Sequence, residues 1–562
     1  MPFVQRVTTL RNGDKKEMTL EQKLRNSDRE KIILFAVVFG GVVIRIFMAY
    51  WHFTHVDDIA CLISFLGQHG TNEISQGKRF STFFTYAPLQ GIFISLLVNH
   101  SFPYKVNVFL SRLPSCFFGI FSIVIALKVV QFIAKKNIKY ITILTVALLC
   151  FSWENIIYSA QAEPYTIIVF FGLLIILSAF QNFYESWKKT FIYLILFTLG
   201  CYGHYQFFIL LFCYYIALFI YNLKKKDNRL RIVIIAFANL LCALPLILFF
   251  INNGRMTNGI NWNRGIGDKF LLVMESPHII NNLRHFLKFF LTNSFYIFKY
   301  FFTIDSFDIL SDIFACCLLL IAFIGYLQIH KKNLLMAIYS DILIVVVTLL
   351  IVMQKLTFGP SRHGLYLYPL LLLFVCYGFL FFTGFVKNKD IAVSCCKFVF
   401  AYITISFFFS LPREIGNRKN LISEKEINEL VLFYKPAFLL VGEWMFDLFA
   451  MHIDGYEQKS DWHAGCEKNN WQDEDNRRVL FYSRTQNIQS IFERNDLNYL
   501  KENRVWSKTN DIKSVKTLYK KEIALQTEIE YASSLYWNYP NGCYMYIFEP
   551  ILNTDSSDGG GL

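Results

Sequence analysis

Long apolar runs separated by short polar stretches fill most of the chain up to about residue 410. A helix of roughly 20 apolar residues is long enough to cross a lipid bilayer. The apolar runs lie at residues 32–51, 113–133, 140–157, 165–180, 191–221, 232–251, 309–327, 334–352, 365–385 and 391–409. The pattern therefore predicts a bundle of membrane-spanning helices.

The run at residues 191–221 is too long for one helix, and Gly203, His204, Tyr205 and Gln206 interrupt it. Lysines flank both of its ends. Because Lys and Arg concentrate in cytoplasmic loops, lysines at both ends indicate an even number of crossings. The run is predicted to be a hairpin of two short helices, with His204 as a polar residue of its turn.

With this hairpin the chain crosses the membrane about eleven times, and all the cationic loops fall on the side of the N-terminus. That side is the cytoplasm. An odd number of crossings then places everything after residue 409 outside. We predict a multi-pass protein of the plasma (inner) membrane, with a cytoplasmic N-terminus and an extracytoplasmic C-terminal domain.

The composition agrees with a membrane protein, and it affects how the positive net charge is interpreted. Of the 562 residues, 54% are hydrophobic and only 17% are charged, and the mean hydropathy is +0.38. No soluble domain of this length could bury so much apolar surface. The net charge of +13 comes from short runs between apolar stretches, so the lysines and arginines indicate orientation and not nucleic-acid binding.

The predicted fold class is an all-α polytopic membrane protein with a small α/β domain after it. The segments are 1–31 (cytoplasmic), 32–411 (transmembrane domain), 412–555 (extracytoplasmic domain) and 556–562 (a disordered tail). Residues 478–482 predict a strand and residues 487–501 a helix. Residues 431–451 are apolar but carry charges that are costly in a bilayer, which favours an amphipathic helix on the outer surface.

Two further features concern the outer side. Residues 277–300 mix Arg284, His285 and Lys288 with Phe and Leu, as is typical of an interfacial amphipathic helix. Of the thirteen cysteines, only Cys466 and Cys543 lie in the polar C-terminal region. They could form a disulfide in an oxidising compartment, or stay apart.

Three acids lie at predicted outer helix ends. Asp57 and Asp58 follow the first apolar run, and Glu163 precedes Pro164 in the next short outer turn. Asp often caps a solvated helix end, and a negative charge is favourable at a helix N-terminus. The alternative is that these carboxylates take part in chemistry at the outer face.

Four motifs occur one after another along the chain, each at a predicted outer helix end. They are the acidic pair, residues 111–115 (Ser-Arg-Leu-Pro-Ser), residues 161–165 (Gln-Ala-Glu-Pro-Tyr) and residues 361–369 (Ser-Arg-His-Gly-Leu-Tyr-Leu-Tyr-Pro). Together they resemble the GT-C glycosyltransferases, above all the branch with protein O-mannosyltransferases and the lipid A aminoarabinose transferase (glycosyltransferase families 39 and 83). The resemblance implies a GT-C-like helix bundle over residues 32–409.

The resemblance also implies an activity. Such enzymes move a sugar from a polyprenyl-phosphate lipid to a glycan, lipid or protein acceptor outside the cytoplasm. Their catalytic base in the first outer loop corresponds to Asp57 or Asp58, and we favour Asp57. Glu163 corresponds to a position that binds a metal or the acceptor in some members, so a divalent cation could serve there, and no other cofactor is implied.

Cations at the predicted outer face could bind the donor phosphate. A phosphate leaving group needs electrostatic stabilisation, and the planar guanidinium of Arg suits it. The candidates are Lys78, Arg79, Arg112, Arg255, Arg264, Lys269, Arg362 and His363. Any one of them could instead face anionic headgroups. Arg112 and Arg362 are favoured because each opens an apolar run, where an unpartnered charge is costly.

Two rival functions use the same bundle. A transporter or flippase of lipid-linked sugars would also carry outer charges, but transporters often show internal repeats and charges near the midplane. A glycan polymerase or ligase differs mainly in the size of its donor. The concentration of ionisable residues at outer helix ends favours a glycosyltransferase.

The lysine pattern makes the orientation testable. Cysteine-accessibility labelling of intact cells should modify a cysteine placed at Ser460 but not one placed at Asn137, because only the first position is predicted to lie outside. Labelling of Asn137 in intact cells would show that the orientation is wrong.

Overall fold

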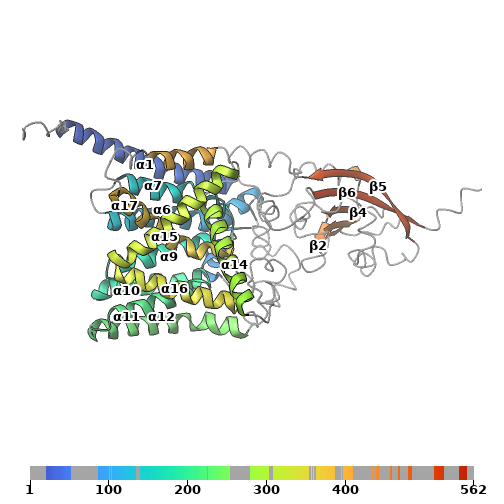
Figure 1. The fold of residues 1–562 in the computed structure, drawn as a ribbon. Helices are drawn as coiled ribbons and strands as arrows, with labels where there is room; N and C mark the ends of the chain where they lie inside the picture. The colour runs from blue at the N-terminus through green and yellow to red at the C-terminus, as the bar shows by residue number, and fades with distance from the viewer. Residues whose placement is uncertain are drawn as a thin grey trace, which may run out of the picture.

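The computed structural model describes residues 20–51, 87–99, 101–102, 104–134, 139–224, 226–252, 279–302, 308–353, 356, 358–359, 362–385, 394, 396–408, 430, 433–434, 438–441, 456–458, 466–468, 479–483, 512–523 and 543–552. These residues form a bundle of helices and a separate sheet (Figure 1). The N-terminal end of α1 and the sheet lie beyond opposite ends of the bundle, in agreement with an odd number of crossings.

The bundle contains long and short helices. They are α1 (Leu20–Trp51), α5 (Pro88–Leu97), α6 (Tyr104–Ala134), α7 (Lys139–Cys150), α8 (Trp153–Ser159), α9 (Tyr165–Phe180), α10 (Trp187–Gly203), α11 (Phe207–Tyr221), α12 (Lys226–Asn252), α14 (Ile279–Phe302), α15 (Asp308–Lys332), α16 (Leu334–Val352), α17 (Tyr368–Phe385) and a helix at Cys396–Phe408. Two 3-10 helices, η2 (Phe183–Glu185) and η3 (Arg362–Leu367), complete the set.

The prediction of a helical, multi-pass membrane protein is confirmed. Within the described ranges, six helices are long and apolar enough to cross a membrane, or seven if α7 and α8 form one bent span. Their outer surfaces carry exposed apolar side chains such as Phe35, Phe237 and Phe323, each more than half exposed, as expected of a surface that faces lipid. The remaining predicted crossings coincide with shorter helices, so the count of eleven stays a prediction.

The predicted hairpin is present. Helices α10 and α11 are separated by His204–Gln206, and Phe183, just before α10, stacks on Tyr214 in α11, so the two helices run antiparallel. The run at residues 140–157, by contrast, is not one straight helix. It breaks after Cys150 and continues as α8 at an angle of 52°, because the polar segment that begins at Ser152 makes contacts outside the helix.

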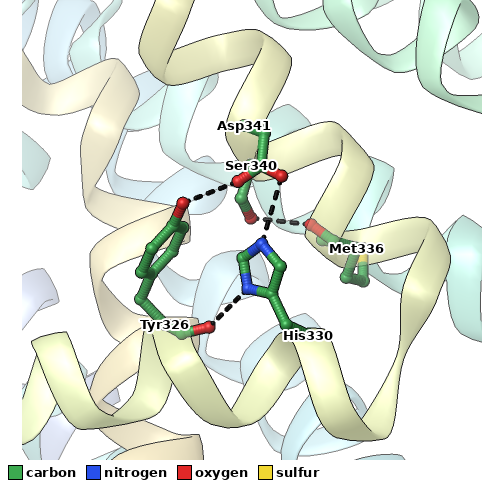
Figure 2. A network of polar contacts seen from close by, with 5 residues as sticks. All are labelled: Tyr326, His330, Met336, Ser340 and Asp341. Atoms are coloured by element: carbon green, nitrogen blue, oxygen red, sulfur yellow. Dashed lines mark hydrogen bonds and ion pairs between the residues drawn. The ribbon is translucent and has the colours of Figure 1, made fainter.

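Helices α15 and α16 form a tight pair that a single residue, Asn333, connects. The Asn333 side chain accepts a hydrogen bond from the Met336 N–H at 3.1 Å and so caps α16. Above this turn, Asp341 binds both His330 (3.1 Å) and the Tyr326 hydroxyl (2.7 Å), while His330 also contacts the Tyr326 carbonyl (Figure 2). These bonds tie the two helices together at the end that carries Lys331 and Lys332.

Among the described helices that are long enough to cross a membrane, α17 is the most buried. In its apolar window 72% of the residues are buried, against 28% in α1 and in α12. Its Gly378 faces the backbone of α15 at Ile321, and Gly325 of α15 faces the backbone of α17 at Phe374, so neither position has space for a Cβ. Small residues at a crossing let two helix backbones approach closely, a common device in membrane proteins.

The C-terminal region contributes a six-stranded sheet with the order β2-β3-β1-β4-β6-β5. Its strands are β1 (Phe438–Val441), β2 (Tyr456–Gln458), β3 (Cys466–Lys468), β4 (Val479–Ser483), β5 (Ile512–Ile523) and β6 (Cys543–Leu552). Only β1 and β4 pair in parallel. The strand predicted at residues 478–482 is confirmed as β4, and the helix predicted at 487–501 lies outside the described residues.

One prediction about this region is wrong, and one of two alternatives for its cysteines is excluded. The apolar stretch at 431–451 does not form an amphipathic helix, because its Phe-Leu-Leu-Val core is β1, an inner strand of the sheet, where a short continuous apolar run belongs. Cys466 and Cys543 cannot pair. Strands β3 and β6 are separated by β1 and β4, which places them roughly 14 Å apart, well beyond the Cα separation of a disulfide.

Arg45, inside the first span, is buried among the helices at the break between α7 and α8. Its guanidinium donates to the carbonyls of Leu149 at 2.9 Å and Cys150 at 3.1 Å, and to Gly41 at 3.0 Å in its own helix. The last carbonyls of a helix have no partner within it. The other two at this end, Ala147 and Leu148, accept from the Phe151 N–H and the Tyr368 hydroxyl.

All four carbonyls at the end of α7 therefore have donors, and Arg45 supplies two of them. The helix dipole adds to the effect, because a cation is stabilised at a helix C-terminus. The bend of the span thus depends on a side chain from α1.

Arg45→Met should lower the thermal stability of the purified protein, because the Leu149 and Cys150 carbonyls would stay buried without donors, at about 1–3 kcal/mol each. Lys128→Met is the matched control, since Lys128 is also a cation within a long apolar helix but is exposed. Equal melting temperatures for the two variants would contradict a role of Arg45 in the bend.

Candidate functional site

The turn at residues 160–164, between α8 and α9, carries two buried polar side chains. Gln161 is fully buried and Glu163 is 3% exposed. A buried carboxyl or amide is costly unless it has partners. Polar side chains are therefore not placed in such a turn for packing alone, which makes this turn the centre of the candidate site.

Helix α6 holds the backbone of this turn. The Ser115 hydroxyl donates to the Glu163 carbonyl at 2.6 Å and accepts from the Gln90 amide of α5 at 3.2 Å. The Thr166 hydroxyl at the start of α9 donates to the Ser115 carbonyl at 2.8 Å. Ser115, from the motif at 111–115, and Glu163, from the motif at 161–165, are thus brought together.

Arg112, one turn earlier on the same helix, holds the end of α1. Its guanidinium donates to the Ala49 carbonyl at 3.1 Å, one of the last carbonyls of α1. The sequence suggested that Arg112 lies at the beginning of a helix. It does not, because α6 starts at Tyr104 and the polar residues before the apolar run are already helical. Arg112 is 1% exposed, and its predicted contact with the donor phosphate stays a prediction.

Helix α14 binds the same region from another side. In Figure 1 it runs across the ends of the other helices, and we call this the α14 end of the bundle. The Tyr300 hydroxyl lies 2.5 Å from that of Tyr158, two residues before Ala160. The next carbonyl, of Phe301, accepts from the Ser152 hydroxyl at 2.7 Å.

An ion pair fastens the last turn of α14 to a further helix. Lys299 lies 2.9 Å from Asp312 of α15. The helix predicted at residues 277–300 is confirmed, and its side that faces away from the bundle carries Arg284, Lys288 and Leu291, all exposed. Its position in a membrane interface stays a prediction.

His204 lies close to the site and has the role expected of a turn residue. Its Nδ1 accepts a hydrogen bond from the Gln206 N–H at 3.2 Å, which stabilises the turn just before α11. Its ring packs on that of Tyr165, with centroids 5.5 Å apart. The turn of the α10–α11 hairpin thus lies at the α14 end, beside the first residue of α9.

The other predicted site residues are described in part or not at all. Asp57, Asp58, Lys78, Arg79, Arg255, Arg264 and Lys269 lie outside the described residues. Arg362 and His363 belong to η3, which packs on α9 and leads into α17. Their backbone is therefore near α9, the helix that follows Glu163.

Sequence reasoning missed Arg45, Gln161 and the bonds of Ser115. Of these, only Arg45 could have been found from the sequence, because an arginine inside an apolar run needs a buried partner. Among the described residues, no three His, Cys, Asp or Glu side chains are grouped as a metal site would require. A metal site would need Glu163 together with the acidic pair.

The arrangement can hold charged and polar groups of a substrate in a place with little water. It combines Gln161 and Glu163 of the turn with an amide of α5, a hydroxyl and a guanidinium of α6 and a hydroxyl of α9. Electrostatic interactions are stronger in such surroundings than in water.

Comparisons with known proteins give only a weak likeness to solved structures. No protein family and no curated protein matches the sequence. Two crystal structures of the Archaeoglobus fulgidus oligosaccharyltransferase are weakly similar to this chain. The complex with Zn and sulfate has a TM-score of 0.37 and 10% identity, over 66% of this chain and 53% of that one.

The second structure is tethered to an acceptor peptide with the NVT sequon through a disulfide bond. It has a TM-score of 0.39 and 10% identity, over 68% of this chain and 55% of that one. The chain thus spans about half the length of these structures. At such TM-scores the likeness supports no conclusion about activity.

The close packing of α6 on α8 gives a test of the site's rigidity. A Cβ at Gly119 would overlap the Ser159 hydroxyl and lie 3.3 Å from Arg45 Nε. Gly119→Ala should therefore lower the melting temperature, although Ala normally favours a helix over Gly by roughly 0.5–1 kcal/mol. Gly40→Ala is the control, because its Cβ would meet only Phe151 at 3.8 Å. A more stable Gly119→Ala protein would contradict this packing.

Proposed function

We propose that the protein is a GT-C-type glycosyltransferase that moves a sugar from a polyprenyl-phosphate lipid to an acceptor on the outer side of the membrane. One observation carries the proposal. Arg112 and Ser115, one turn apart on α6, bind the end of α1 and the Glu163 turn respectively. The acidic pair follows α1 and lies eight and nine residues after Ala49, within reach of Glu163 by chain length.

The chemistry needs such an arrangement of acids. An acceptor hydroxyl has a high pKa, so a carboxylate must take its proton as the bond to the sugar forms. Asp57 is the proposed base, and Asp58 orients it or binds a cation. Glu163 binds the acceptor or a divalent cation together with the pair.

The leaving group is the phosphate of the lipid carrier. It departs as a stable anion, so it needs cations rather than a proton donor. Lys78, Arg79, Arg255, Arg264, Arg362 and His363 are the proposed contacts of this phosphate. The Nη1 of Arg112 already donates to the Ala49 carbonyl. We therefore assign Arg112 mainly to positioning the loop that follows α1.

The position of the donor phosphate relative to the membrane is the last part of the proposal. A polyprenyl chain is apolar and stays in the bilayer, so its phosphate lies at the level of the headgroups. The α14 end of the bundle, with Arg284 and Lys288 exposed on α14, offers cations at that level. This end is the outer one in the predicted orientation.

Asp57→Asn should reduce sugar transfer by roughly 10²- to 10⁴-fold, because asparagine keeps the shape of the side chain but cannot accept the proton. The measurement is transfer from a synthetic polyprenyl-phosphate sugar by the purified protein, beside donor binding. Asp58→Asn is the companion variant and should change affinity as well as rate. Near-normal turnover in both single variants and in the double variant would remove the catalytic role. A transporter of lipid-linked sugars would then be the better interpretation.

A further inference from the structure

The amide of Gln161 is the most unusual polar group in the described part of the chain. The side chain is fully buried, and neither its nitrogen nor its oxygen has a hydrogen-bond partner there. Because both ends of the amide lack a partner, exchanging nitrogen and oxygen changes nothing. Leaving a buried amide unbonded is unfavourable, and native proteins rarely do so.

A second buried amide is linked to the same turn through Ser115. Gln90 donates from Nε2 to Ser115, which in turn donates to the Glu163 carbonyl, but the Gln90 oxygen has no partner among the described residues. One amide within the Glu163 turn and one linked to it through Ser115 thus have unused hydrogen-bonding atoms. Other buried amides of the bundle differ: Asn239 donates to Leu194 and Thr198 and accepts from the Tyr215 hydroxyl.

We propose that Gln161 binds the sugar of the substrate, with its NH₂ donating to one hydroxyl and its oxygen accepting from another. The proposal rests on the proposed function and names the part of the substrate that this turn takes. A phosphate diester offers only acceptors, so it could bond the NH₂ but not the amide oxygen. Neighbouring hydroxyls of a sugar ring both donate and accept, and they satisfy both ends of the amide.

Gln90 would extend the same subsite. Its free oxygen needs a donor, which a further sugar hydroxyl supplies and a phosphate does not. A site built to bond hydroxyls discriminates strongly against molecules without them, because its polar groups then stay buried and unbonded. Gln161 and Gln90 are therefore positioning and specificity residues, and the acidic pair remains the proposed catalytic part.

The test uses Gln161→Met, which keeps the length of the side chain but removes both polar atoms. The probes are short-chain polyprenyl-phosphate mannose, glucose and N-acetylglucosamine, and the same polyprenyl phosphate without a sugar. The wild-type protein should bind at least one glycolipid more tightly than the bare carrier. Gln161→Met should weaken binding of that glycolipid by roughly 10- to 30-fold, as the loss of two hydrogen bonds implies, and leave binding of the bare carrier unchanged.

Thermal stability separates this role from a structural one. Gln161→Met should raise the melting temperature without ligand, because an unbonded buried amide is replaced by an apolar group. Asn239→Leu is the matched control and should lower it, because the Asn239 amide is bonded at both ends. A fall in the melting temperature of Gln161→Met like that of Asn239→Leu would show that the amide is bonded within the protein and would overturn the proposal.

The failure of this inference can be told from the failure of the proposed function. If wild-type protein transfers sugar but Gln161→Met binds glycolipid and bare carrier as wild type does, the sugar assignment is wrong and the transferase proposal stands. If Gln161→Met loses glycolipid binding selectively while wild-type protein transfers no sugar, the sugar subsite stands and the transferase proposal does not. Wild-type protein that binds every glycolipid no more tightly than the bare carrier overturns the assignment of Gln161.

Discussion

The fold of this protein depends on how the carbonyls at buried helix ends find donors inside an apolar bundle. No water is available there, so an unbonded backbone carbonyl is costly. Two arginines solve the problem: Arg45 bonds the end of α7, and Arg112 bonds the end of α1. A guanidinium suits this role because it carries five N–H donors in one plane and can serve several carbonyls at once.

Both arginines also determine where the candidate site lies. By ending α7 within the bundle, Arg45 allows α8 to bend away by 52° and to bring the Glu163 turn against α6. Arg112 fixes the end of α1 on the same helix. The last turn of α14 then closes the group through Tyr300 and Phe301. The Glu163 turn and the end of α1 are thus positioned by hydrogen bonds from neighbouring helices.

The sequence predicted what depends on local pattern. Apolar length located the spans, the lysines at 188–189 and 224–226 indicated that residues 191–221 form a hairpin, and the short apolar run at residues 478–482 predicted β4. What it could not predict depends on contacts between distant residues. The break after Cys150 is invisible to hydropathy because α7 and α8 together are apolar enough to pass as one span. The strand β1 looked helical because its neighbours in the sheet are far away in the sequence. For the site, the sequence indicated Glu163 and Arg112, but the bonds of Ser115 and the unbonded amide of Gln161 depend on the packing of α5, α6 and α9.

Arg45 also has a consequence for how the protein is inserted into the membrane during its synthesis. The carbonyls that it bonds are 104 and 105 residues further along the chain, so α1 enters the membrane long before its partner exists. An arginine inside a newly inserted helix is disfavoured by roughly 2.5 kcal/mol on insertion scales. The first helix must therefore wait near the translocon, or with its guanidinium turned toward the headgroups, until α7 has been synthesised. Completion of the broken span would then mark the point at which the N-terminal half of the bundle becomes fixed.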